Sequence, residues 1–278
     1  MSQRDRKPPR ASRRAALSIG AVGIAFATLL LRVLPAYAAP AGDGTPDQAI
    51  PILAYHRFAP TVTDSMTVTT ATFEGHLQYL ADNGYTVIPL RRLVDAWRGV
   101  APPVPPHSVV ITVDDGHRSV YGVMYPLVRR FAVPVTAFIY PSAISRADYA
   151  LTWVQLRELR ASGLFDIQSH TYWHPNFHTE KHRLTPDEYT AFVTLQLERS
   201  RAILERELGE PVALLSWPFG IYDADLVALA RRAGYVAAVT IDGRPARPRD
   251  DLMALPRFLM TERLAGRAFG RLLEATSR

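Results

Sequence analysis

The sequence predicts an α/β fold in which parallel strands, covered by helices, curl into a distorted (β/α) barrel of about seven strands. Short apolar runs alternate with amphipathic stretches along the chain, which is typical of strands that alternate with helices. The 240 residues from 39 to 278 suit one such barrel, because α/β barrels commonly reach about 200–250 residues as one domain. We therefore expect one catalytic domain over residues 39–278.

The first 38 residues have the pattern of an export signal. A basic segment is followed by an uncharged apolar stretch over residues 15–31, and Ala36-Tyr37-Ala38 has the small residues of a cleavage site. The paired Arg13 and Arg14 resemble a twin-arginine signal. An uncleaved anchor is the alternative, since the apolar stretch reaches the lower limit of the about 17–25 residues that span a bilayer. We expect cleavage before Ala39 and export to the periplasm or the extracellular space, with envelope association left open.

Removal of this leader changes the charge of the chain. Residues 1–38 hold 7 of the 32 Lys and Arg residues and one acid, which leaves 25 bases against 25 acids. The mature chain therefore gives no reason to expect a nucleic-acid partner, and it has no apolar stretch that would span a membrane. The absence of cysteine excludes disulfides and thiol chemistry. We expect a monomer.

Each predicted element has its own sequence signal. Short apolar runs flanked by turn residues predict strands at Ile52–Tyr55, Tyr85–Ile88, Ser108–Val113, Val135–Tyr140, Phe165–Gln168, Val212–Ser216 and Val236–Ile241, with Leu255–Met260 as an eighth candidate. Amphipathic stretches predict helices at Ala71–Asn83, Leu90–Trp97, Ser119–Arg130, Trp153–Ala161, Thr185–Leu208, Asp223–Ala233 and Glu262–Leu273. The longest helix has the clearest limits, because Thr185 to Glu188 form a capping box with proline at the first helical position and Gly209 follows its end.

Polar residues follow several of these strands, and in a barrel the carboxyl ends of the strands carry the chemistry. His56 follows the first strand, Asp114 and Asp115 follow the third, His170 follows the fifth, and Trp217-Pro218-Phe219-Gly220 follows the sixth. Because these ends meet at one face of a barrel, we expect the residues to line one pocket.

The aspartate pair and two histidines predict a metal site. Asp-Gly after a strand is an ordinary turn signal, but two adjacent carboxylates repel each other unless a cation compensates them. His170 and His174 lie four residues apart, and Pro175 favours a loop or a single turn over a long helix there. Ligands from Asp115, His170 and His174 would leave a coordination position open, as in catalytic zinc sites, and Asp114 would be free for proton transfer.

The other histidines and the aromatic motif have weaker signals. His56 is the best placed imidazole acid, because the chain has no histidine after His182. Trp217 and Phe219 offer aromatic faces that suit sugar rings, although an aromatic residue at a barrel mouth often only packs. Four histidines over residues 170–182 also allow an adventitious metal-binding loop. We expect His76 and His107 to be structural, and His117, which lies next to the aspartates, to contact the metal ligands without binding the ion itself.

Together these motifs resemble the polysaccharide deacetylase family, carbohydrate esterase family 4, also called the NodB-homology domain, from about Ile52 to about Arg257. The resemblance implies that Asp114 is the general base and that Asp115, His170 and His174 are the metal ligands. It also implies that the backbone N–H of Phe219, within Trp217-Pro218-Phe219-Gly220, helps to hold the oxyanion and that this motif contacts the substrate.

The sequence departs from the common family pattern in two places. Ser216 and Trp217 occupy the stretch where many members have an arginine that pairs with the base, and the C-terminal Leu-x-His is absent. Both absences are shared by the branch that resembles bacterial poly-N-acetylglucosamine deacetylases, which have segments like Tyr55-His56 and Leu255-Pro256-Arg257. This similarity implies that His56 is the acid and that Arg257 supplies the charge near Asp114.

The activity that the resemblance implies is hydrolysis of N-acetyl groups from an N-acetylhexosamine polysaccharide with release of acetate, and poly-N-acetylglucosamine is the expected polymer. One divalent metal ion is expected, and mixed Asp and His ligands suit zinc as well as cobalt, nickel or iron. Three alternatives stay open: an O-acetyl esterase acting on polysaccharide, a non-catalytic polysaccharide-binding protein on the same fold, and a metal-storage or sensing role for the histidine-rich segment.

Overall fold

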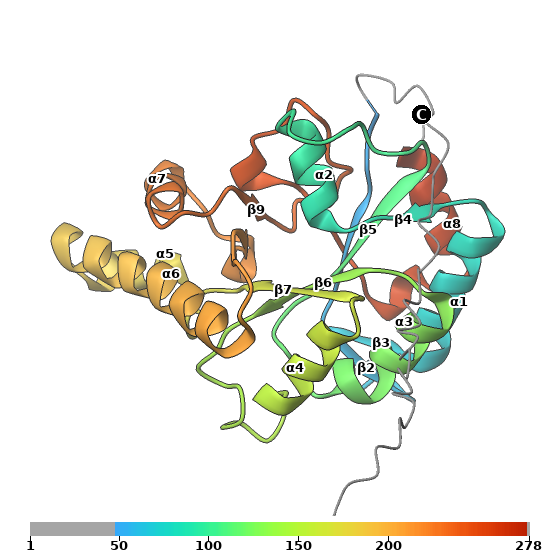
Figure 1. The fold of residues 1–278 in the computed structure, drawn as a ribbon, viewed down its shortest axis with the longest axis horizontal. Helices are drawn as coiled ribbons and strands as arrows, with labels where there is room; N and C mark the ends of the chain where they lie inside the picture. The colour runs from blue at the N-terminus through green and yellow to red at the C-terminus, as the bar shows by residue number, and fades with distance from the viewer. Residues whose placement is uncertain (1–47, 277–278) are drawn as a thin grey trace, which may run out of the picture. The chain divides into compact units, whose positions relative to one another are not determined.

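A curled sheet of parallel strands lies at the centre of residues 48–276, which are the residues that this computed structural model describes (Figure 1). Seven strands are neighbours in the order β10-β1-β5-β6-β7-β8-β9, and the short β4 pairs with the start of β5. The strands are β1 Ile52–Tyr55, β4 Thr86–Val87, β5 Ser108–Val113, β6 Val135–Ile139, β7 Phe165–Ser169, β8 Leu214–Ser216, β9 Ala237–Val239 and β10 Phe258–Leu259. The predicted distorted (β/α) barrel of about seven strands is confirmed.

The segment from Leu255 to Leu259 connects the two edges of this sheet. Leu255 forms a parallel bridge with Val239 at the end of β9, while Phe258 of β10 is in register with Leu53 of β1. Arg257 lies between these two contacts. The side chain of Arg257 is fully buried among the strand ends as a result.

The helices cover the outside of the sheet, with α1 and α8 on the right of Figure 1 and α5, α6 and α7 on the left. They are α1 Thr70–Asp82, α2 Leu90–Trp97, α3 Tyr125–Phe131, α4 Trp153–Ala161, α5 Phe177–Arg183, α6 Pro186–Leu208, α7 Ala224–Arg232 and α8 Arg267–Thr276. Four short turns complete the elements: η1 Val120–Met124, η2 Pro218–Gly220, η3 Leu252–Ala254 and η4 Glu262–Leu264. As predicted, α6 begins at the capping box of Thr185 and Glu188 and ends at Gly209, which has a left-handed φ of 70°.

Successive side chains of each strand point to opposite faces of the sheet, so the buried apolar residues form two separate clusters. One cluster packs against the surrounding helices and includes Leu53, Ile111 and Ile139. The other lies inside the barrel and joins the inward-facing Ile52, Val110 and Phe138 to Leu90 and Leu93 of α2. Leu90 and Leu93 of α2 thereby fill the amino-terminal end of the barrel interior, and the polar residues of the candidate site lie at the carboxyl ends of the strands.

Two predicted helices are interrupted. The expected helix over residues 119–130 begins as the π-helical turn η1 before α3, where Pro126 has no N–H to donate within the helix. The expected helix over residues 262–273 is divided into η4 and α8 at Gly266, which has a φ of 54°. The sequence reasoning also missed α5 and the small parallel pair β2 Arg57–Ala59 and β3 Thr67–Thr69.

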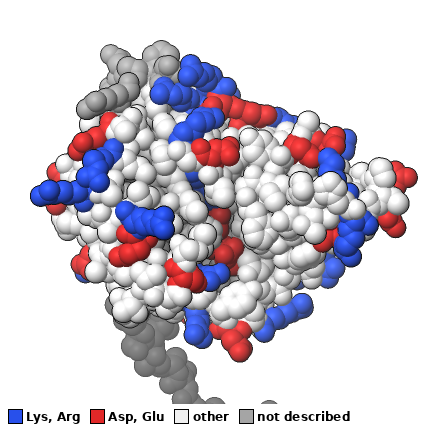
Figure 2. Space-filling model, turned by 180° about the vertical axis from the view of Figure 1, so that it is seen from behind, with Lys and Arg blue, Asp and Glu red and all other residues white. Residues whose placement is uncertain are grey.

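Lys and Arg side chains are interspersed with Asp and Glu side chains on the face that Figure 2 shows, and they do not gather into one patch. Among residues 48–276, no helix combines the length and the apolar character needed to cross a membrane. The predicted export signal over residues 1–38 lies outside the described residues.

Candidate metal centre and active site

The two aspartates after β5 point in different directions. Alternation along β5 places Asp114 on the inner face with Thr112, and the chain then turns through two left-handed residues, Asp115 at φ 73° and Gly116 at φ 72°. A Cβ on Gly116 would lie 3.0 Å from Cδ1 of Ile139, so this turn requires glycine for space as well as for conformation. The side chain of Asp115 is partly exposed as a result, whereas Asp114 stays buried.

Asp115 and the two predicted histidines bring three donor atoms together. Their ligand atoms all lie within 4.8 Å of one another, and they form the only such group of three or more His, Asp or Glu ligands among residues 48–276. Oδ1 of Asp115 is 3.6 Å from Nε2 of His170 and 3.8 Å from Nε2 of His174. One carboxylate and two imidazoles match the composition of catalytic zinc sites, which keep further positions open.

A hydrogen bond orients the ring of His170 toward Asp115. Nδ1 of His170 lies 2.7 Å from the backbone carbonyl oxygen of Ser216. A carbonyl oxygen can only accept, so Nδ1 carries the proton and the lone pair of Nε2 faces Asp115. This arrangement is typical of histidines that bind metals through the opposite nitrogen.

His174 is held by a loop and not by a helix. Thr171 and His174 adopt left-handed φ values of 65° and 64°, and the Thr171 hydroxyl accepts from the His174 backbone N–H. The loop that was predicted from Pro175 is therefore present. Burial lowers the pKa of His174 to about 4, and the nearby His170 adds to this effect. His174 is consequently neutral at pH 7, which is the form that binds a metal ion.

The Asp115, His170 and His174 set therefore fits a divalent ion. Replacing His170 with alanine should reduce severalfold the tightly bound metal that the protein retains through gel filtration, because one of three protein ligands is lost. Metal content after gel filtration, measured by inductively coupled plasma mass spectrometry, checks this. His107→Ala, an exposed histidine in the loop before β5, is the matched control. An unchanged metal content in His170→Ala would remove His170 from the ligand set.

Asp114 forms a two-point ion pair with Arg257 in the barrel interior. Nη1 and Nη2 of Arg257 donate to Oδ1 and Oδ2 of Asp114 at 2.8 Å and 2.7 Å. Arg257 also donates to the Thr240 carbonyl oxygen and to Thr112 Oγ1. Arg257 thus lies where the sequence reasoning placed a compensating charge, and its full burial separates it from substrate.

Ser216 completes this network. Its hydroxyl donates to Oδ2 of Asp114 at 2.9 Å and accepts from Nη2 of Arg257 at 2.8 Å. The same residue accepts from His170 through its backbone carbonyl oxygen. Ser216 was not predicted as a site residue, although its position at the end of β8 was the signal that could have found it.

The network fixes the charge of Asp114. Burial alone would raise the pKa of Asp114, but the charge and hydrogen bonds of Arg257 outweigh burial and hold the pKa well below its usual range. Asp114 is therefore ionised at every pH above the strongly acidic range. The ion pair with Arg257 orients the carboxylate of Asp114 and keeps it negatively charged. The same ion pair lowers the affinity of Asp114 for a proton and so makes it a weaker base.

His56 lies beside the aspartates at the end of β1. Burial lowers the pKa of His56, while the charges of Asp114 and Asp115 act in the opposite direction. Its Nδ1 is buried and has no hydrogen-bond partner. A buried polar atom without a partner is uncommon and is often found at functional sites.

His76, which we expected to be structural, is packed in the core. Its ring nitrogens lie within hydrogen-bonding distance of the Tyr55 hydroxyl and the Leu264 carbonyl oxygen.

The segment after β8 differs from the prediction in part. Trp217 is 1% exposed and its Nε1 donates to the Met253 carbonyl oxygen, so its ring cannot stack on a sugar. The prediction of a Trp217 stacking wall is wrong because the ring packs inward against Phe177. Pro218 is also buried. Phe219 is 56% exposed, with its ring 4.5 Å from that of His174, so Phe219 is the aromatic residue of this motif that faces outward.

Two tyrosines that the sequence reasoning missed lie beside the histidines. The Tyr140 ring is 5.5 Å from His174, and its hydroxyl is 2.8 Å from that of the exposed Tyr149, whose ring stacks on His117. Burial, together with the bond to Tyr149, raises the pKa of Tyr140. Tyr140 follows β6, so the strand-end pattern that located Asp114 applied to it as well.

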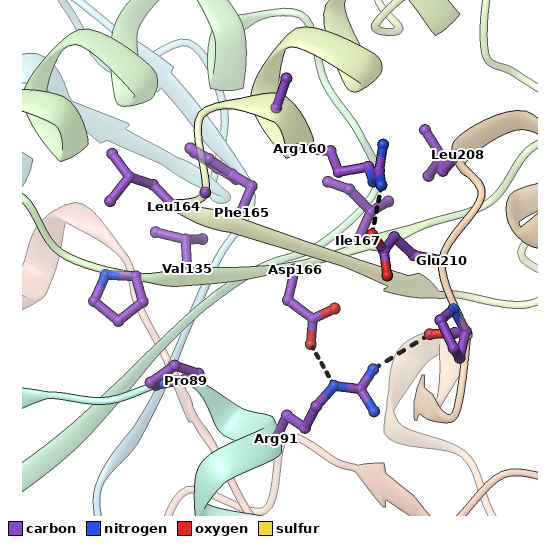
Figure 3. Close-up of a pocket in the computed structure, with 14 residues that line it drawn as sticks. Pro89, Arg91, Val135, Arg160, Leu164, Phe165, Asp166, Ile167, Leu208 and Glu210 are labelled. Atoms are coloured by element: carbon purple, nitrogen blue, oxygen red, sulfur yellow. Dashed lines mark hydrogen bonds and ion pairs between the residues drawn. The ribbon is translucent and has the colours of Figure 1, made fainter. Parts of the chain in front are cut away.

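A cavity of about 690 Å³ at the opposite end of the strands is not a second reaction site (Figure 3). It lies at the starts of β6 and β7, and its charged side chains are paired with each other. Arg91 contacts Asp166 at 3.5 Å and Arg160 binds Glu210, so neither acid is presented to a substrate.

Comparison with known proteins agrees with this geometry. Residues 101–238 match the family model described as polysaccharide deacetylase. YxkH of Bacillus subtilis (strain 168), which is named as a polysaccharide deacetylase, is 28% identical over 81% of this chain and 76% of that protein. The solved Streptococcus pyogenes deacetylase PplD, in complex with acetate, has the same fold, with a TM-score of 0.72 at 22% identity over 82% of this chain and 99% of that chain.

A second curated relative is the poly-β-1,6-N-acetyl-D-glucosamine N-deacetylase of Escherichia coli (strain K12). It is 24% identical over 228 residues, which make up 70% of this chain and 34% of that protein. The chain therefore spans about a third of the length of this relative.

Proposed function

We propose that this chain, which contains a polysaccharide deacetylase domain of the NodB/CE4 type, hydrolyses the N-acetyl groups of an N-acetylhexosamine polysaccharide and releases acetate. The observation that supports this activity best is the convergence of Asp115, His170 and His174 on one point, with the ionised Asp114 beside them. Three donor atoms that could hold a metal ion and a separate carboxylate therefore lie together at one end of the barrel, which supports the proposal.

Asp115, His170 and His174 would hold the divalent ion, and zinc, cobalt, nickel or iron would suit these ligands. When bound there, the ion supplies Lewis-acid chemistry: it makes a nearby water a nucleophile at neutral pH and polarises the acetamide carbonyl. Asp114 accepts the proton of the attacking water. Because Arg257 and Ser216 hold both carboxylate oxygens, Asp114 can present its lone pair in a single orientation.

His56 supplies the proton that the leaving amine needs. A C–O bond forms to the carbonyl carbon, the C–N bond breaks, and the amine nitrogen takes a proton from the imidazole. Burial lowers the pKa of His56, while the negative charges of Asp114 and Asp115 oppose this effect and favour the protonated imidazolium that acts as the acid. One proton leaves water for Asp114 and one leaves His56 for the amine, so release of the first and uptake of another by His56 restore both groups for the next turnover.

Phe219 has two roles in the proposal. Its backbone N–H helps to hold the developing oxyanion, and a left-handed φ of 56° aims the segment outward. A Cβ on the following Gly220 would meet Cγ1 of Ile241 at 2.6 Å, so glycine keeps this turn in place. The exposed rings of Phe219, Tyr149 and Tyr222 provide faces for sugar stacking.

Replacing His56 with glutamine should lower acetate release from N-acetylglucosamine oligomers by about 10²–10⁴-fold, because the general acid is lost. Hydrolysis of p-nitrophenyl acetate should change far less, since that leaving group departs without protonation. The bound metal should stay unchanged, and His107→Gln is the matched control. Equal losses on both substrates would assign His56 to another role.

The substrate proposal is tested with a panel of N-acetylated and O-acetylated polymers. We expect acetate from β-1,6-linked N-acetylglucosamine oligomers in preference to chitin oligomers, peptidoglycan and acetylated xylan, because the E. coli relative is named for that polymer. Faster release from acetylated xylan would favour an O-acetyl esterase. Oligosaccharide binding without any acetate release would indicate a non-catalytic binding protein.

We also propose that residues 1–38 are an export signal and that residues 39–278 act as one catalytic domain outside the cytoplasm. The sequence pattern of the first 38 residues supports this proposal, and so does the polymer class of the proposed substrate.

A further inference from the structure

We propose that His178 and His182 form a second divalent-metal site on the surface of α5, in addition to the set of Asp115, His170 and His174. The two side chains lie one helical turn apart and both are exposed. Their Nε2 atoms face each other at 3.4 Å. Two imidazole nitrogens therefore lie close enough together to bind one ion, outside the candidate active site.

The separation of these nitrogens suits a shared ion better than a hydrogen bond. Nitrogen ligands about 2.0–2.1 Å from zinc, at a tetrahedral angle, lie about 3.4 Å from each other. A nitrogen donor normally lies about 2.7–3.2 Å from its acceptor, so 3.4 Å is long for a direct bond between the rings.

The pair has the same ring arrangement as the predicted active-site ligands. The ring centroids of His178 and His182 are 4.6 Å apart with an interplanar angle of 69°, and His170 and His174 have the same two values. One of these pairs belongs to the deacetylase site and the other to no described function. The two histidine pairs therefore share the same relative arrangement of their rings.

The surroundings of the pair do not oppose a cation. Lys181 on the same helix directs its Nζ to Asp223 at 2.6 Å, and Arg183 is paired with Glu180. Asn176 caps the start of α5, which begins with the fully buried Phe177, so the helix is anchored to the core. The histidines are thus presented on a fixed backbone, while the positive charges nearby are neutralised by carboxylates.

Two imidazoles select ions of borderline softness, such as zinc, nickel or copper, over magnesium or calcium. Water would fill the remaining positions, because no third His, Asp or Glu ligand completes this pair among the described residues. We therefore expect the second site to bind zinc more weakly, and to exchange it faster, than the site with three protein ligands.

Isothermal titration calorimetry, in which zinc chloride is added to metal-free protein, tests the proposal. Wild type should bind two zinc ions with separate affinities. His182→Gln should weaken only the lower-affinity event, by on the order of 10-fold or more, because the chelate is lost. His107→Gln, which changes an exposed histidine elsewhere, should titrate as wild type. Asp115→Ala should weaken the tighter binding event and leave the weaker one unchanged. The two variants therefore show separately whether each proposed site binds zinc.

A single binding event in wild type would overturn the proposal. The same would follow if His182→Gln or His178→Gln titrated as wild type, or if His107→Gln lost as much affinity. Melting curves without metal should be unchanged in these surface variants, which separates loss of a ligand from loss of the fold. With zinc in excess, wild type should melt at a higher temperature than His182→Gln.

Discussion

Asp114→Asn is expected to lower acetate release from N-acetylglucosamine oligomers by about 10²–10⁴-fold, the usual contribution of a general base. Asparagine keeps the shape of the side chain but cannot accept the proton of the attacking water. The metal content should stay close to that of wild type, since Asp115, His170 and His174 are unchanged. Acetate release and bound metal, measured on the same preparation, check both halves of the expectation.

The substitution also removes the charge opposite Arg257, so its effect on folding has to be measured separately. Breaking one side of a buried ion pair typically costs about 3–5 kcal/mol, and rates should be compared at a temperature where the variant is folded. Asp82→Asn, at the exposed end of α1, is the matched control and should keep full activity. Wild-type turnover in folded Asp114→Asn would remove the base assignment.

Arg257→Met is expected to lower the free energy of unfolding by about 3–5 kcal/mol at pH 7, because the buried carboxylate of Asp114 loses its partner. Burial alone raises the pKa of Asp114, and in the variant nothing of comparable strength opposes this effect. In wild type the low pKa of Asp114 stabilises the fold above pH about 4 and that stabilisation is lost as pH falls. In the variant, Asp114 can take up a proton instead, so the difference in the free energy of unfolding between variant and wild type should become smaller toward pH 4. Urea unfolding of both proteins at pH 7 and pH 4 measures this difference.

Two further variants show whether this effect comes from the ion pair. The double variant Asp114→Asn with Arg257→Met should lose less stability than the two single changes together, because no buried charge is left without a partner. Arg257→Lys keeps a charge but not the two-point geometry, and it should recover part of the stability. Additive losses in the double variant, or a penalty that does not change with pH, would contradict the proposed network.

The fold was predictable because its strands are short apolar runs with clear ends. Ser108–Val113 was predicted with the limits that the structure gives β5, and Thr185 with Gly209 marked the ends of α6. The helix over residues 119–130 was harder, since Pro126 produces a π-helical turn where amphipathic spacing alone predicts regular helix. The pair of β2 and β3 was missed because three-residue strands carry no usable periodicity.

The site was predictable as far as it follows the ends of strands. Asp114, His170 and His56 meet because their strands are parallel, and that rule needed no side-chain geometry. The inward rotation of Trp217 was not predictable, because strand position does not say whether an aromatic ring faces the core or the pocket. The bond from His170 to the Ser216 carbonyl oxygen joins segments 46 residues apart, and only the packed structure shows it.

The central claim, metal-dependent N-deacetylation at this site, is tested most directly by acetate release from β-1,6-linked N-acetylglucosamine oligomers before and after chelation. We predict that wild type releases acetate, that a chelator abolishes the release, and that added zinc or cobalt restores it. His170→Ala should stay inactive at the same added metal concentration. Acetate release that persists after complete metal removal, or that is equal in His170→Ala, would contradict the claim.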